Sequence, residues 1–374
     1  MNITTGTILF YLPSFEAGGA ERQALNLAIE LKTRHNYHVV LAAQYKGGPI
    51  EIEALRYDIT CIEIHFDFYY FNFYKLSGFS ISKFKAYLKF KAIKNNYLTI
   101  VKQVKPNFIF SYCYEPNVIA SYFSNDYKNC KVIWNQRDTG IPPFTKCKIE
   151  QIAINNAFKI IGNSASAIHY VTSIYNVTPK CSVIKNGVEL TQKEIISSRV
   201  DFGFNDHDFI IGMIANYSEV KNHQTLIKAY HQLKDESIKL ILIGRFTDDV
   251  KKKLCSLTTK DIKFHYQNTN IASIINMCNV IVHPSLSEGL PNGVLEAMMC
   301  KKLVIVSNID PHKEILGSNY SYMFSVNDDD LLSKLINQSK SQNNELIINE
   351  NYNIVNSNFS VSSLSTQYYN LIHE

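Results

Sequence analysis

Two carboxylates, Glu288 and Glu296, mark the stretch of this sequence whose chemistry is clearest. Gly289, Pro291 and Gly293 turn the chain between them from a loop into a helix, since proline is tolerated where a helix begins. We expect Glu288 on the loop and Glu296 about two turns into the helix. A helix start binds anions such as a diphosphate, and a carboxylate accepts hydrogen bonds from paired hydroxyls. The pattern therefore suits a nucleotide-sugar.

The residues ahead of this turn support that interpretation. The apolar run Val280–Val282 predicts a buried parallel strand, and His283, Pro284 and Ser285 follow it. The alternative is a strand, loop and helix that carry two solvated glutamates. The His-Pro-Ser and Glu-Gly-Leu-Pro context favours the binding site over this alternative.

At these residues the chain resembles the retaining GT-B glycosyltransferases of family 4, the glycosyl transferases group 1, whose members carry both glutamates in a Ser-Glu-Gly-x-Pro frame. The resemblance implies an α/β fold in which two Rossmann-like doubly wound domains face a cleft. It also implies that Glu288 contacts the donor sugar, that Glu296 contacts the ribose, and that the amides around Gly289 and Leu290 face the diphosphate.

A further candidate group, Lys221, follows the strand predicted at 209–214. The family reads Gly-Arg-Leu-x-x-x-Lys-Gly here, and its Arg and Lys reach the diphosphate. Lys221 matches the lysine, whereas Asn216 stands where the arginine would be. A lysine at such a turn is often simply solvated, but beside an anion site we favour stabilisation of the leaving group. Arg245, after the strand at 240–244, could replace the missing charge.

The first half of the chain opens with a strand at 7–12, a turn with Gly18 and Gly19, and a helix at 20–31. Paired glycines let another group approach the backbone closely, and a plain helix-entry turn explains them equally well on local grounds. The family resemblance favours the first interpretation, because its Gly-Gly-Ala-Glu-Arg loop faces the reaction centre. We therefore place both glycines on the acceptor side.

Arg137 follows the strand predicted at 131–134 and is the other acceptor-side candidate. Polar residues at the carboxyl end of a parallel strand lie where such sheets bind ligands. Arg137 could bind an acceptor phosphate or a donor phosphate, and an ion pair with Asp138 or another acid is about as plausible. Many members of the family have a histidine near here. This chain has none there, so we predict no catalytic histidine.

The same reasoning divides the chain into domains. We predict an N-terminal acceptor-side domain at 1–190 and a linker at 191–208, with a short helix at 192–198 as its alternative. A C-terminal nucleotide-sugar-binding domain at 209–355 follows. By the resemblance, the terminal helix at 356–374 crosses back to the first domain.

The composition bears on domain number, on cellular location and on metal binding. The chain has 374 residues, enough for two domains, and no apolar run approaches the roughly 18 residues that span a bilayer. Its eight cysteines are scattered without a Cys-x-x-Cys pair, which favours reduced thiols in a cytosol. The run Asp328–Asp330 invites a metal site, but acidic residues before an apolar pair are typical of a helix start. We expect no metal and no cofactor.

One block has an unusual charge pattern. Residues 68–114 hold eight lysines, many aromatic residues and no Asp or Glu. Phe90, Ile93, Tyr97, Val101 and Val104 recur at helical spacing and predict a core face. The remaining lysines and the aromatic cluster at 69–73 suit an anionic membrane surface. A buried helix with lysines that extend to solvent is the alternative, and no motif supports nucleic acid as a partner.

We therefore predict a cytoplasmic glycosyltransferase, peripheral on the inner face of the cell membrane. It would move a sugar with retention from a UDP- or GDP-linked donor to a lipid-linked saccharide acceptor, in surface polysaccharide synthesis of the O-antigen, lipopolysaccharide or capsule type. Two alternatives remain. One is a nucleotide-sugar epimerase of the same fold, and the other is a non-catalytic subunit of a glycosyltransferase complex.

Overall fold

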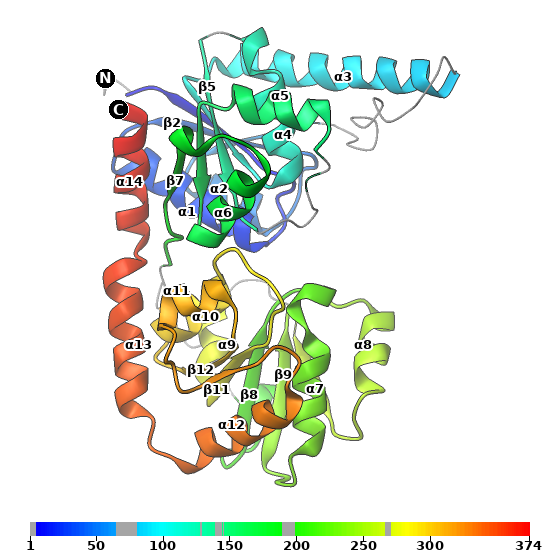
Figure 1. The fold of residues 1–374 in the computed structure, drawn as a ribbon, viewed down its shortest axis with the longest axis vertical. Helices are drawn as coiled ribbons and strands as arrows, with labels where there is room; N and C mark the ends of the chain where they lie inside the picture. Colours follow the sequence, from blue (N-terminus) through cyan, green and yellow to red (C-terminus); the bar gives the residue numbers. More distant parts are fainter. Residues whose placement is uncertain are drawn as a thin grey trace. The chain divides into compact units, whose positions relative to one another are not determined.

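The computed structural model describes residues 5–64, 81–127, 129–138, 144, 146–188, 199–265 and 271–374, apart from the side chains of residues 81–83, 85 and 86. The chain forms two compact units (Figure 1). Met1–Lys185 and Leu364–Glu374 make the first unit, and Asn186–Ser363 makes the second. Residues 191–198 of the predicted linker, which include the alternative helix at 192–198, lie outside the described residues.

The first unit is built on a seven-stranded parallel sheet with the order β3-β2-β1-β4-β5-β6-β7. Its strands are mostly apolar on consecutive residues, as expected when both faces are buried. They are β1 (Thr7–Tyr11), β2 (His38–Ala43), β3 (Thr60–Glu63), β4 (Phe108–Tyr112), β5 (Lys131–Gln136), β6 (Lys159–Gly162) and β7 (Cys181–Val183). β5 runs two residues past the predicted end, so Asn135 and Gln136 belong to the sheet and not to the loop.

Helices connect these parallel strands and cover both faces of the sheet. They are α1 (Gly19–Thr33), α2 (Pro49–Arg56), α3 (Ile81–Val104), α4 (Tyr114–Tyr122), α5 (Lys148–Asn156) and α6 (Ala165–Ile174), with the 3-10 turns η2 (Ser124–Asp126) and η3 (Thr178–Lys180). Successive strand side chains point to opposite faces. Leu9 and Tyr11 therefore join one core cluster, and Ile8 and Phe10 join the other.

The last helix, α14 (Val361–His373), belongs to the first unit although it follows the second in sequence. Its inner face is buried in the same cluster as Phe10 and consists of Leu364, Tyr368, Leu371 and Ile372. The Tyr368 hydroxyl donates a hydrogen bond to Asn135 Oδ1 of β5. Ser365 Oγ donates to Glu30 Oε2 of α1 at 3.2 Å.

The second unit is built on a six-stranded parallel sheet with the order β10-β9-β8-β11-β12-β13. Its strands are β8 (Phe209–Ile214), β9 (Ile238–Ile243), β10 (Ile262–His265), β11 (Val280–His283), β12 (Leu303–Ser307) and β13 (Met323–Phe324). Its helices are α7 (His223–Gln232), α8 (Asp248–Cys255), α9 (Ile271–Met277), α10 (Asn292–Met299), α11 (Asp310–Leu316), α12 (Asp329–Ser341) and α13 (Glu345–Asn358), with the 3-10 turns η4 (Val200–Phe202) and η5 (Glu219–Lys221).

The acidic run at the start of α12 forms a helix cap. Asp328 is the residue before the helix, and its Oδ1 accepts a hydrogen bond from the backbone N–H of Leu331 at 2.9 Å. Asp329 and Asp330 lie in the first turn, where carboxylates are favoured by the helix dipole. This agrees with the helix start predicted from the sequence.

In both sheets the strand order reverses beside the first strand, between β1 and β4 and between β8 and β11. The loops that follow the two strands diverge at such a point. They leave room for a ligand at the carboxyl edge of the sheet. This edge of the second sheet is where the predicted donor-site residues should gather.

Helix α3 carries the basic, aromatic block. Phe90, Ile93, Tyr97 and Val101 are buried, which confirms the predicted core face, while Val104 packs against it partly buried. The predicted cluster at 69–73 lies outside the described residues. Among the helices of the described part of the chain, none is long and apolar enough to cross a membrane.

Removal of one core contact of α14 tests its part in the first unit. Leu364 is 2% exposed, so Leu364→Ala should lower the free energy of unfolding by roughly 2–5 kcal/mol. Leu346→Ala in α13 is the control, because Leu346 is 81% exposed and its loss should change stability by less than about 0.5 kcal/mol. Urea denaturation of both variants measures the difference. Equal midpoints would show that α14 does not stabilise the first unit.

Candidate functional site

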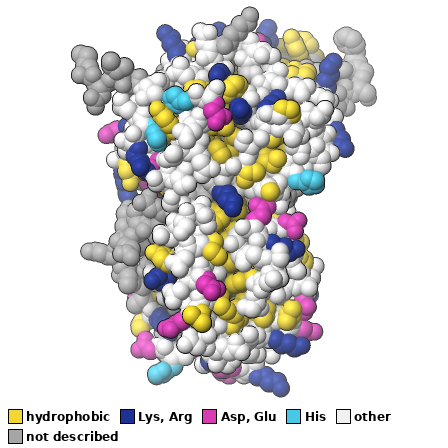
Figure 2. All heavy atoms as spheres, turned by 60° about the vertical axis from the view of Figure 1, so that its left-hand side comes forward, with side chains coloured by type: hydrophobic (Ala, Val, Ile, Leu, Met, Phe, Trp, Pro, Cys, Tyr) yellow, Lys and Arg dark blue, Asp and Glu magenta, His cyan; other side chains and the backbone are white. Residues whose placement is uncertain are grey.

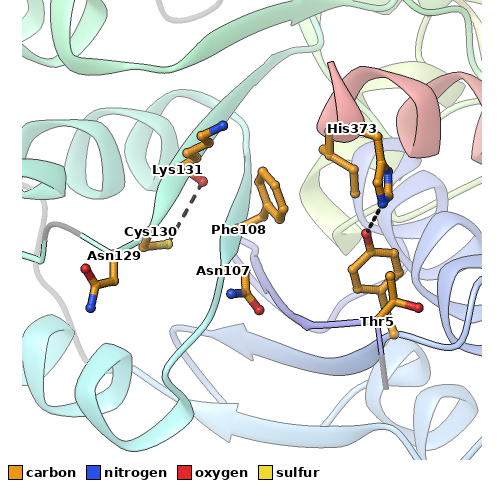
Figure 3. Close-up of a pocket in the computed structure, with 9 residues that line it drawn as sticks. Thr5, Asn107, Phe108, Asn129, Cys130, Lys131 and His373 are labelled. Atoms are coloured by element: carbon orange, nitrogen blue, oxygen red, sulfur yellow. Dashed lines mark hydrogen bonds between the residues drawn. The ribbon is translucent and has the colours of Figure 1, made fainter. Parts of the chain in front are cut away.

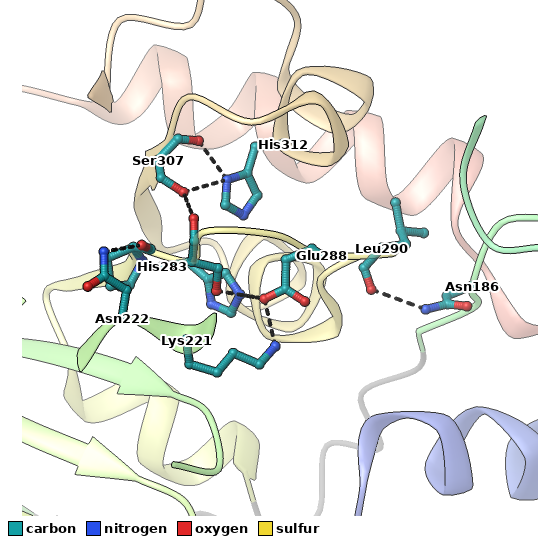
Figure 4. Close-up of polar contacts among 10 residues, drawn as sticks. Asn186, Lys221, Asn222, His283, Glu288, Leu290, Ser307 and His312 are labelled. Atoms are coloured by element: carbon teal, nitrogen blue, oxygen red, sulfur yellow. Dashed lines mark hydrogen bonds and ion pairs between the residues drawn. The ribbon is translucent and has the colours of Figure 1, made fainter. Parts of the chain in front are cut away.

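Two loops meet at the carboxyl edge of the second sheet, where its strand order reverses. β8 leads through η5 to Lys221, and β11 leads to Glu288. Lys221 Nζ lies 2.6 Å from Glu288 Oε1 (Figure 4). The backbone N–H of Leu286 donates to the carbonyl of Val220 at 2.8 Å, which fastens one loop to the other. The structure thus brings together the two residues that the sequence assigns to catalysis.

Glu288 accepts three hydrogen bonds on a single oxygen. Besides Lys221, His283 Nε2 lies 2.9 Å and Ser285 Oγ lies 2.6 Å from Glu288 Oε1. The Glu288 side chain is only 9% exposed. Burial on its own raises the pKa of this carboxyl, but the Lys221 ammonium and the hydrogen bond from His283 outweigh burial and hold the pKa well below its usual range. Glu288 is therefore a charged acceptor at neutral pH.

A second layer of contacts anchors this cluster to the neighbouring strand. Ser307 at the end of β12 donates from Oγ to the carbonyl of Ser285 at 2.5 Å. His312 Nδ1 lies 2.7 Å from the carbonyl of Ser307. Burial lowers the pKa of His312 to about 3, so the ring is neutral and its Nδ1–H donates to that carbonyl. The His312 ring packs edge-to-face with His283, with the ring centroids 5.4 Å apart.

Helix α10 begins directly behind Glu288. Pro291 precedes the helix, and the helical ladder starts with the bond from Val294 N to the Pro291 carbonyl at 3.1 Å. Glu296 is the fifth residue of α10, so it lies about one turn into the helix. The expected two turns are wrong because the loop extends through Pro291 before the helix begins.

The start of α10 is held in place by a side chain and by close packing. Asn186 donates from Nδ2 to Asn292 Oδ1 at 2.6 Å and to the carbonyl of Leu290 at 3.4 Å. A Cβ on Gly293 would lie 3.1 Å from the carbonyl oxygen of Ile214, so glycine lets α10 approach the end of β8. The first amides of a helix have no partner within it. Those amides, together with the buried backbone of Gly289, suit an anion beside Glu288.

Asn216 and Arg245 lie on adjacent loops after β8 and β9. The backbone N–H of Arg245 donates to Asn216 Oδ1 at 3.0 Å, and the backbone N–H of Tyr217 donates to the Arg245 carbonyl at 3.3 Å. A Cβ on Gly244 would lie 2.1 Å from the carbonyl oxygen of Ala215, so only glycine allows this approach. Asn216 therefore fixes the backbone that carries the exposed Arg245 side chain.

In the first unit, the two predicted glycines form the entry to α1. Gly18 precedes the helix and Gly19 is its first residue. A Cβ on Gly18 would lie 2.1 Å from Glu21 Oε2, so the glycine makes room for the buried Glu21 carboxylate to fold back over the helix start. A carboxylate at this position is favoured by the helix dipole. Gly18 thus has a local role in the helix entry.

Arg137 contacts aromatic side chains at the carboxyl edge of the first sheet. Its guanidinium carbon lies 4.6 Å from the centre of the Tyr112 ring, and Nη2 lies 3.4 Å from the Tyr368 hydroxyl. Burial lowers the pKa of this guanidinium, but its tyrosine neighbours outweigh burial and raise the pKa, so Arg137 is charged. Asp138 accepts a hydrogen bond from Gln136 Nε2 at 3.2 Å.

The sequence did not assign a role to several residues that hold this site. His283 and Ser285 are part of the segment that supports the Glu288 motif but have no predicted role of their own. His312 and Asn186 have no predicted function. Asn222 also belongs here: its φ is 55°, and its Nδ2 donates to the Pro284 carbonyl at 3.2 Å and to Asn327 Oδ1 at 3.0 Å. Each is a small polar residue or a histidine at the last position of a parallel strand or on the segment that follows one, which is the signal that could have found them.

A separate cavity of about 370 Å³ lies at the amino edge of the first sheet (Figure 3). It is lined by Thr5, Tyr37, Asn107, Phe108, Asn129, Cys130, Lys131, Ile372 and His373. The Tyr37 hydroxyl lies 3.5 Å from His373 Nε2. This cavity contains none of the predicted site residues, which follow the opposite, carboxyl ends of the strands.

Comparison with known proteins bears directly on the second unit. Residues 194–353 match the family described as glycosyl transferases group 1. Most of the second unit is thus similar to group 1 glycosyltransferases. The match includes Lys221, Glu288 and Glu296, so the contacts of this site lie within the matched region.

Curated relatives are also glycosyltransferases. The chain is 24% identical over 311 residues to the N-acetylgalactosamine-N,N'-diacetylbacillosaminyl-diphospho-undecaprenol 4-alpha-N-acetylgalactosaminyltransferase of Campylobacter jejuni, with 80% of each chain covered. It is 26% identical over 138 residues to the N,N'-diacetylbacillosaminyl-diphospho-undecaprenol alpha-1,3-N-acetylgalactosaminyltransferase of the same organism, which covers 37% of this chain and 36% of that one.

Solved structures show the fold. The Anabaena protein HepE, in complex with UDP and glucose, superposes with a TM-score of 0.81 at 17% identity over 99% of this chain and 100% of its own. A sucrose-phosphate synthase from Thermosynechococcus elongatus gives a TM-score of 0.76 at 14% identity over 98% of both chains. The predicted GT-B architecture of two Rossmann-like units is confirmed.

Removal of Lys221 should change the ionisation of Glu288. Lys221→Met takes away the main group that opposes burial, so the Glu288 pKa should rise toward or above the ordinary value of 4.5. In the wild-type protein the depressed pKa keeps Glu288 charged, and the stability from this pair is present above the unfolded pKa and lost only as pH falls through the lower folded pKa. Carboxyl carbon NMR during an acid titration measures the Glu288 pKa in both proteins.

The matched control is Lys253→Met, which removes an exposed lysine that pairs with Glu219 at 3.3 Å in the same unit. It should leave the Glu288 titration unchanged. If Lys221→Met also left it unchanged, Lys221 would not be what keeps Glu288 charged.

Proposed function

We propose that this protein transfers a sugar, with retention, from a UDP- or GDP-linked donor to a lipid-linked saccharide acceptor. The observation that carries the proposal is the contact of Lys221 and Glu288 beside the start of α10, in the domain that matches the glycosyltransferase family. This contact lies at a strand-order reversal, which is the usual ligand position in such sheets.

The donor would bind along α10. The helix-start amides and Lys221 supply hydrogen bonds and positive charge for the diphosphate. An ammonium group has three N–H donors, so Lys221 can keep its bond to Glu288 and still donate to phosphate oxygens. Glu288 would accept from hydroxyls of the sugar, and Glu296 would accept from hydroxyls of the ribose. Asn216 holds the loop from which Arg245 could add a second positive charge.

The reaction breaks the bond between the anomeric carbon and a diphosphate oxygen. The acceptor hydroxyl forms its new bond on the same face of the sugar, and its proton passes to the departing diphosphate. Negative charge develops on that leaving group, and groups aimed at it before the reaction lower the barrier. Lys221 and the helix amides fill this role in our proposal, which requires neither a metal nor another cofactor.

The acceptor would be bound by the first unit through Gly18, Gly19 and Arg137. The Campylobacter relatives are named for transfer to undecaprenol-diphosphate-linked saccharides, which is why we propose a lipid-linked acceptor. Arg137 keeps its charge at the carboxyl edge of the first sheet and could bind a phosphate of such an acceptor. The setting we propose is surface polysaccharide synthesis on the inner face of the cell membrane.

A membrane surface as partner is supported by α3. Phe84, Tyr87 and Leu88 are 62%, 47% and 48% exposed. With Lys91 they recur at the spacing i, i+3, i+4, i+7, which puts them on one side of the helix, away from the core face that begins at Phe90. Exposed aromatic and apolar residues beside lysines suit the headgroup region of an anionic bilayer.

Nucleic acid fits the surface less well. A nucleic-acid site is expected to show a basic stripe or patch. On the face of the described residues that Figure 2 shows, Lys and Arg side chains lie scattered among Asp and Glu. The formal net charge of the whole chain is only +5.

The proposed function is tested by nucleotide binding and nucleotide release. We expect the protein to bind one of UDP-N-acetylgalactosamine, UDP-glucose or GDP-mannose in calorimetry, with EDTA present throughout. Glu296→Ala should weaken binding of the free nucleotide by about tenfold or more, because hydrogen bonds to a charged group typically contribute ~1.5–3 kcal/mol. Glu350→Ala, at an exposed position of α13, is the control and should bind normally.

The result of the turnover assay distinguishes a glycosyltransferase from an epimerase and from a non-catalytic subunit. Nucleotide release that requires an added lipid-linked saccharide supports transfer. Conversion of one nucleotide-sugar into another without an acceptor would mean an epimerase, and binding without any turnover would mean a non-catalytic subunit. Turnover that is lost with EDTA and restored by magnesium or manganese would overturn metal independence.

Vesicle sedimentation tests the α3 surface. The protein should pellet with anionic vesicles at low salt and less with neutral ones, since attraction to lipid charge is screened by salt. Replacement of Phe84 and Leu88 by Ser, together with Lys89 and Lys91 by Gln, should release it.

The control replaces Lys251 and Lys252 of α8 by Gln, which removes the same charge from the second unit. It should still bind the vesicles. Equal pelleting with neutral and anionic vesicles, or with neither, would leave α3 as an ordinary solvated helix.

A further inference from the structure

We propose that His283 is a positioning residue for the donor sugar: its Nε2–H holds the Glu288 carboxylate in the orientation that binds the sugar hydroxyls, and His312 supports its ring. This inference rests on the proposed function, since it assumes that Glu288 faces the sugar. It assigns a role to two histidines at the ends of neighbouring structural elements, neither of which needs to touch the reacting atoms.

The protonation of His283 follows from its partner. Its Nε2 lies 2.9 Å from Glu288 Oε1, and a carboxylate only accepts, so Nε2 carries the proton. Nδ1 is buried and has no hydrogen-bond partner among the described residues. The side chain is 3% exposed. The one polar interaction of this ring in the described structure is therefore the bond to Glu288.

Burial of the unpaired Nδ1 costs free energy, which a side chain that only fills space would not need to lose. A buried ring nitrogen without a partner loses its hydration and gains nothing in return. A leucine or methionine would occupy a similar volume without that loss. The imidazole is explained by what its other nitrogen does, which is to donate to Glu288 from a fixed point.

The fixed position of His283 Nε2 matters because Lys221, the other strong donor to Glu288, is less constrained. Lys221 is 28% exposed, and its long flexible side chain can keep contact with Glu288 in many orientations of the carboxylate. His283 is the last residue of β11, so the sheet holds its backbone. Donors on strands hold a site more exactly in place than donors on loops. His283 thus defines the direction of the Glu288 carboxylate, and Ser285 adds a second donor from the loop.

His312 limits the movement of the His283 ring. The two rings pack edge-to-face at 5.4 Å between centroids. His312 is itself fixed through the bond of Nδ1 to the Ser307 carbonyl, at the end of β12. β11 and β12 are paired neighbours, so His283 at the end of β11 and His312, which contacts the end of β12 from α11, are held by adjacent strands of one sheet (Figure 4).

If His283 positions Glu288, its replacement should affect binding of the sugar part of the donor and not of the nucleotide part. In the proposed function, Glu296 and the helix amides bind the nucleotide, and Glu288 binds the sugar. Loss of the His283 donor should therefore weaken binding of the intact nucleotide-sugar and leave binding of the free nucleotide unchanged. A merely structural role would weaken both together.

The experiment compares three variants by calorimetry with UDP and with the best donor among UDP-N-acetylgalactosamine, UDP-glucose and GDP-mannose, or with GDP if the last is best. In His283→Met, the preference for nucleotide-sugar over free nucleotide should fall about tenfold or more. His283→Gln should keep most of that preference, because its side-chain amide can donate from nearly the same point. His265→Leu, which removes a half-buried imidazole from the end of β10, should match the wild-type protein.

A measurement on the wild-type protein removes dependence on the folding of any variant. Ring nitrogen NMR should show His283 with its proton on Nε2. A proton on Nδ1 alone would overturn the inference.

Failure of the proposed function and failure of the positioning role alone would give different binding results. If the wild-type protein bound no donor of the panel, the proposed function and this inference would both fall. If it bound a donor and His283→Met lost affinity for nucleotide and nucleotide-sugar alike, or for neither, only the positioning role would be wrong.

Discussion

The buried ion pair between Lys221 and Glu288 is the interaction on which the site depends. Removing two charges from water costs several kcal/mol for each, and mutual attraction offsets this only when other hydrogen bonds complete the geometry. His283 and Ser285 complete it on the carboxylate side. The cost on the lysine side is smaller, because the Lys221 side chain keeps 28% of its exposure.

The pairing also constrains what can neutralise a diphosphate here. Because Glu288 already offsets the charge of Lys221, the pair as a whole is close to neutral. A diphosphate beside it must then depend more on the helix-start amides and on Arg245. Asn216 in place of an arginine sharpens this dependence, since its side chain supports the Arg245 backbone instead of adding a charge. The proposed donor site is thus built more from dipoles than from cations.

The strongest predictions from sequence came where a local rule and the topology agree. Apolar runs predict parallel strands, and residues just after neighbouring strands of a parallel sheet must meet at one edge. Lys221 and Glu288 were predicted from the motif at the helix start and from the family resemblance, and the topology of the sheet brings them into contact. The core face of α3 and the capped start of α12 followed from spacing and charge in the same way.

What the sequence could not predict depends on contacts between distant positions. That Lys221 pairs with Glu288, and does not point away from it, is settled by the close approach of two loops through Leu286 and Val220. The role of His312 depends on the Ser307 carbonyl and the His283 ring, which no local pattern reveals. The start of α10 was misplaced because Gly-Leu-Pro extends the loop by residues that fit a helix start equally well.

The order of the chain gives α14 a consequence for biosynthesis. The second unit is one continuous segment, so a ribosome has released all of it before the part of the final helix that belongs to the first unit, from Leu364 on, emerges. The first unit is synthesised first but lacks Leu364, Tyr368, Leu371 and Ile372 from its core until α14 has been made. Although domains generally fold in the order of their synthesis, here the earlier one is completed last. A nascent chain that stops just before α14 would carry the second unit on a first unit whose apolar sheet face is still open to chaperones and proteases.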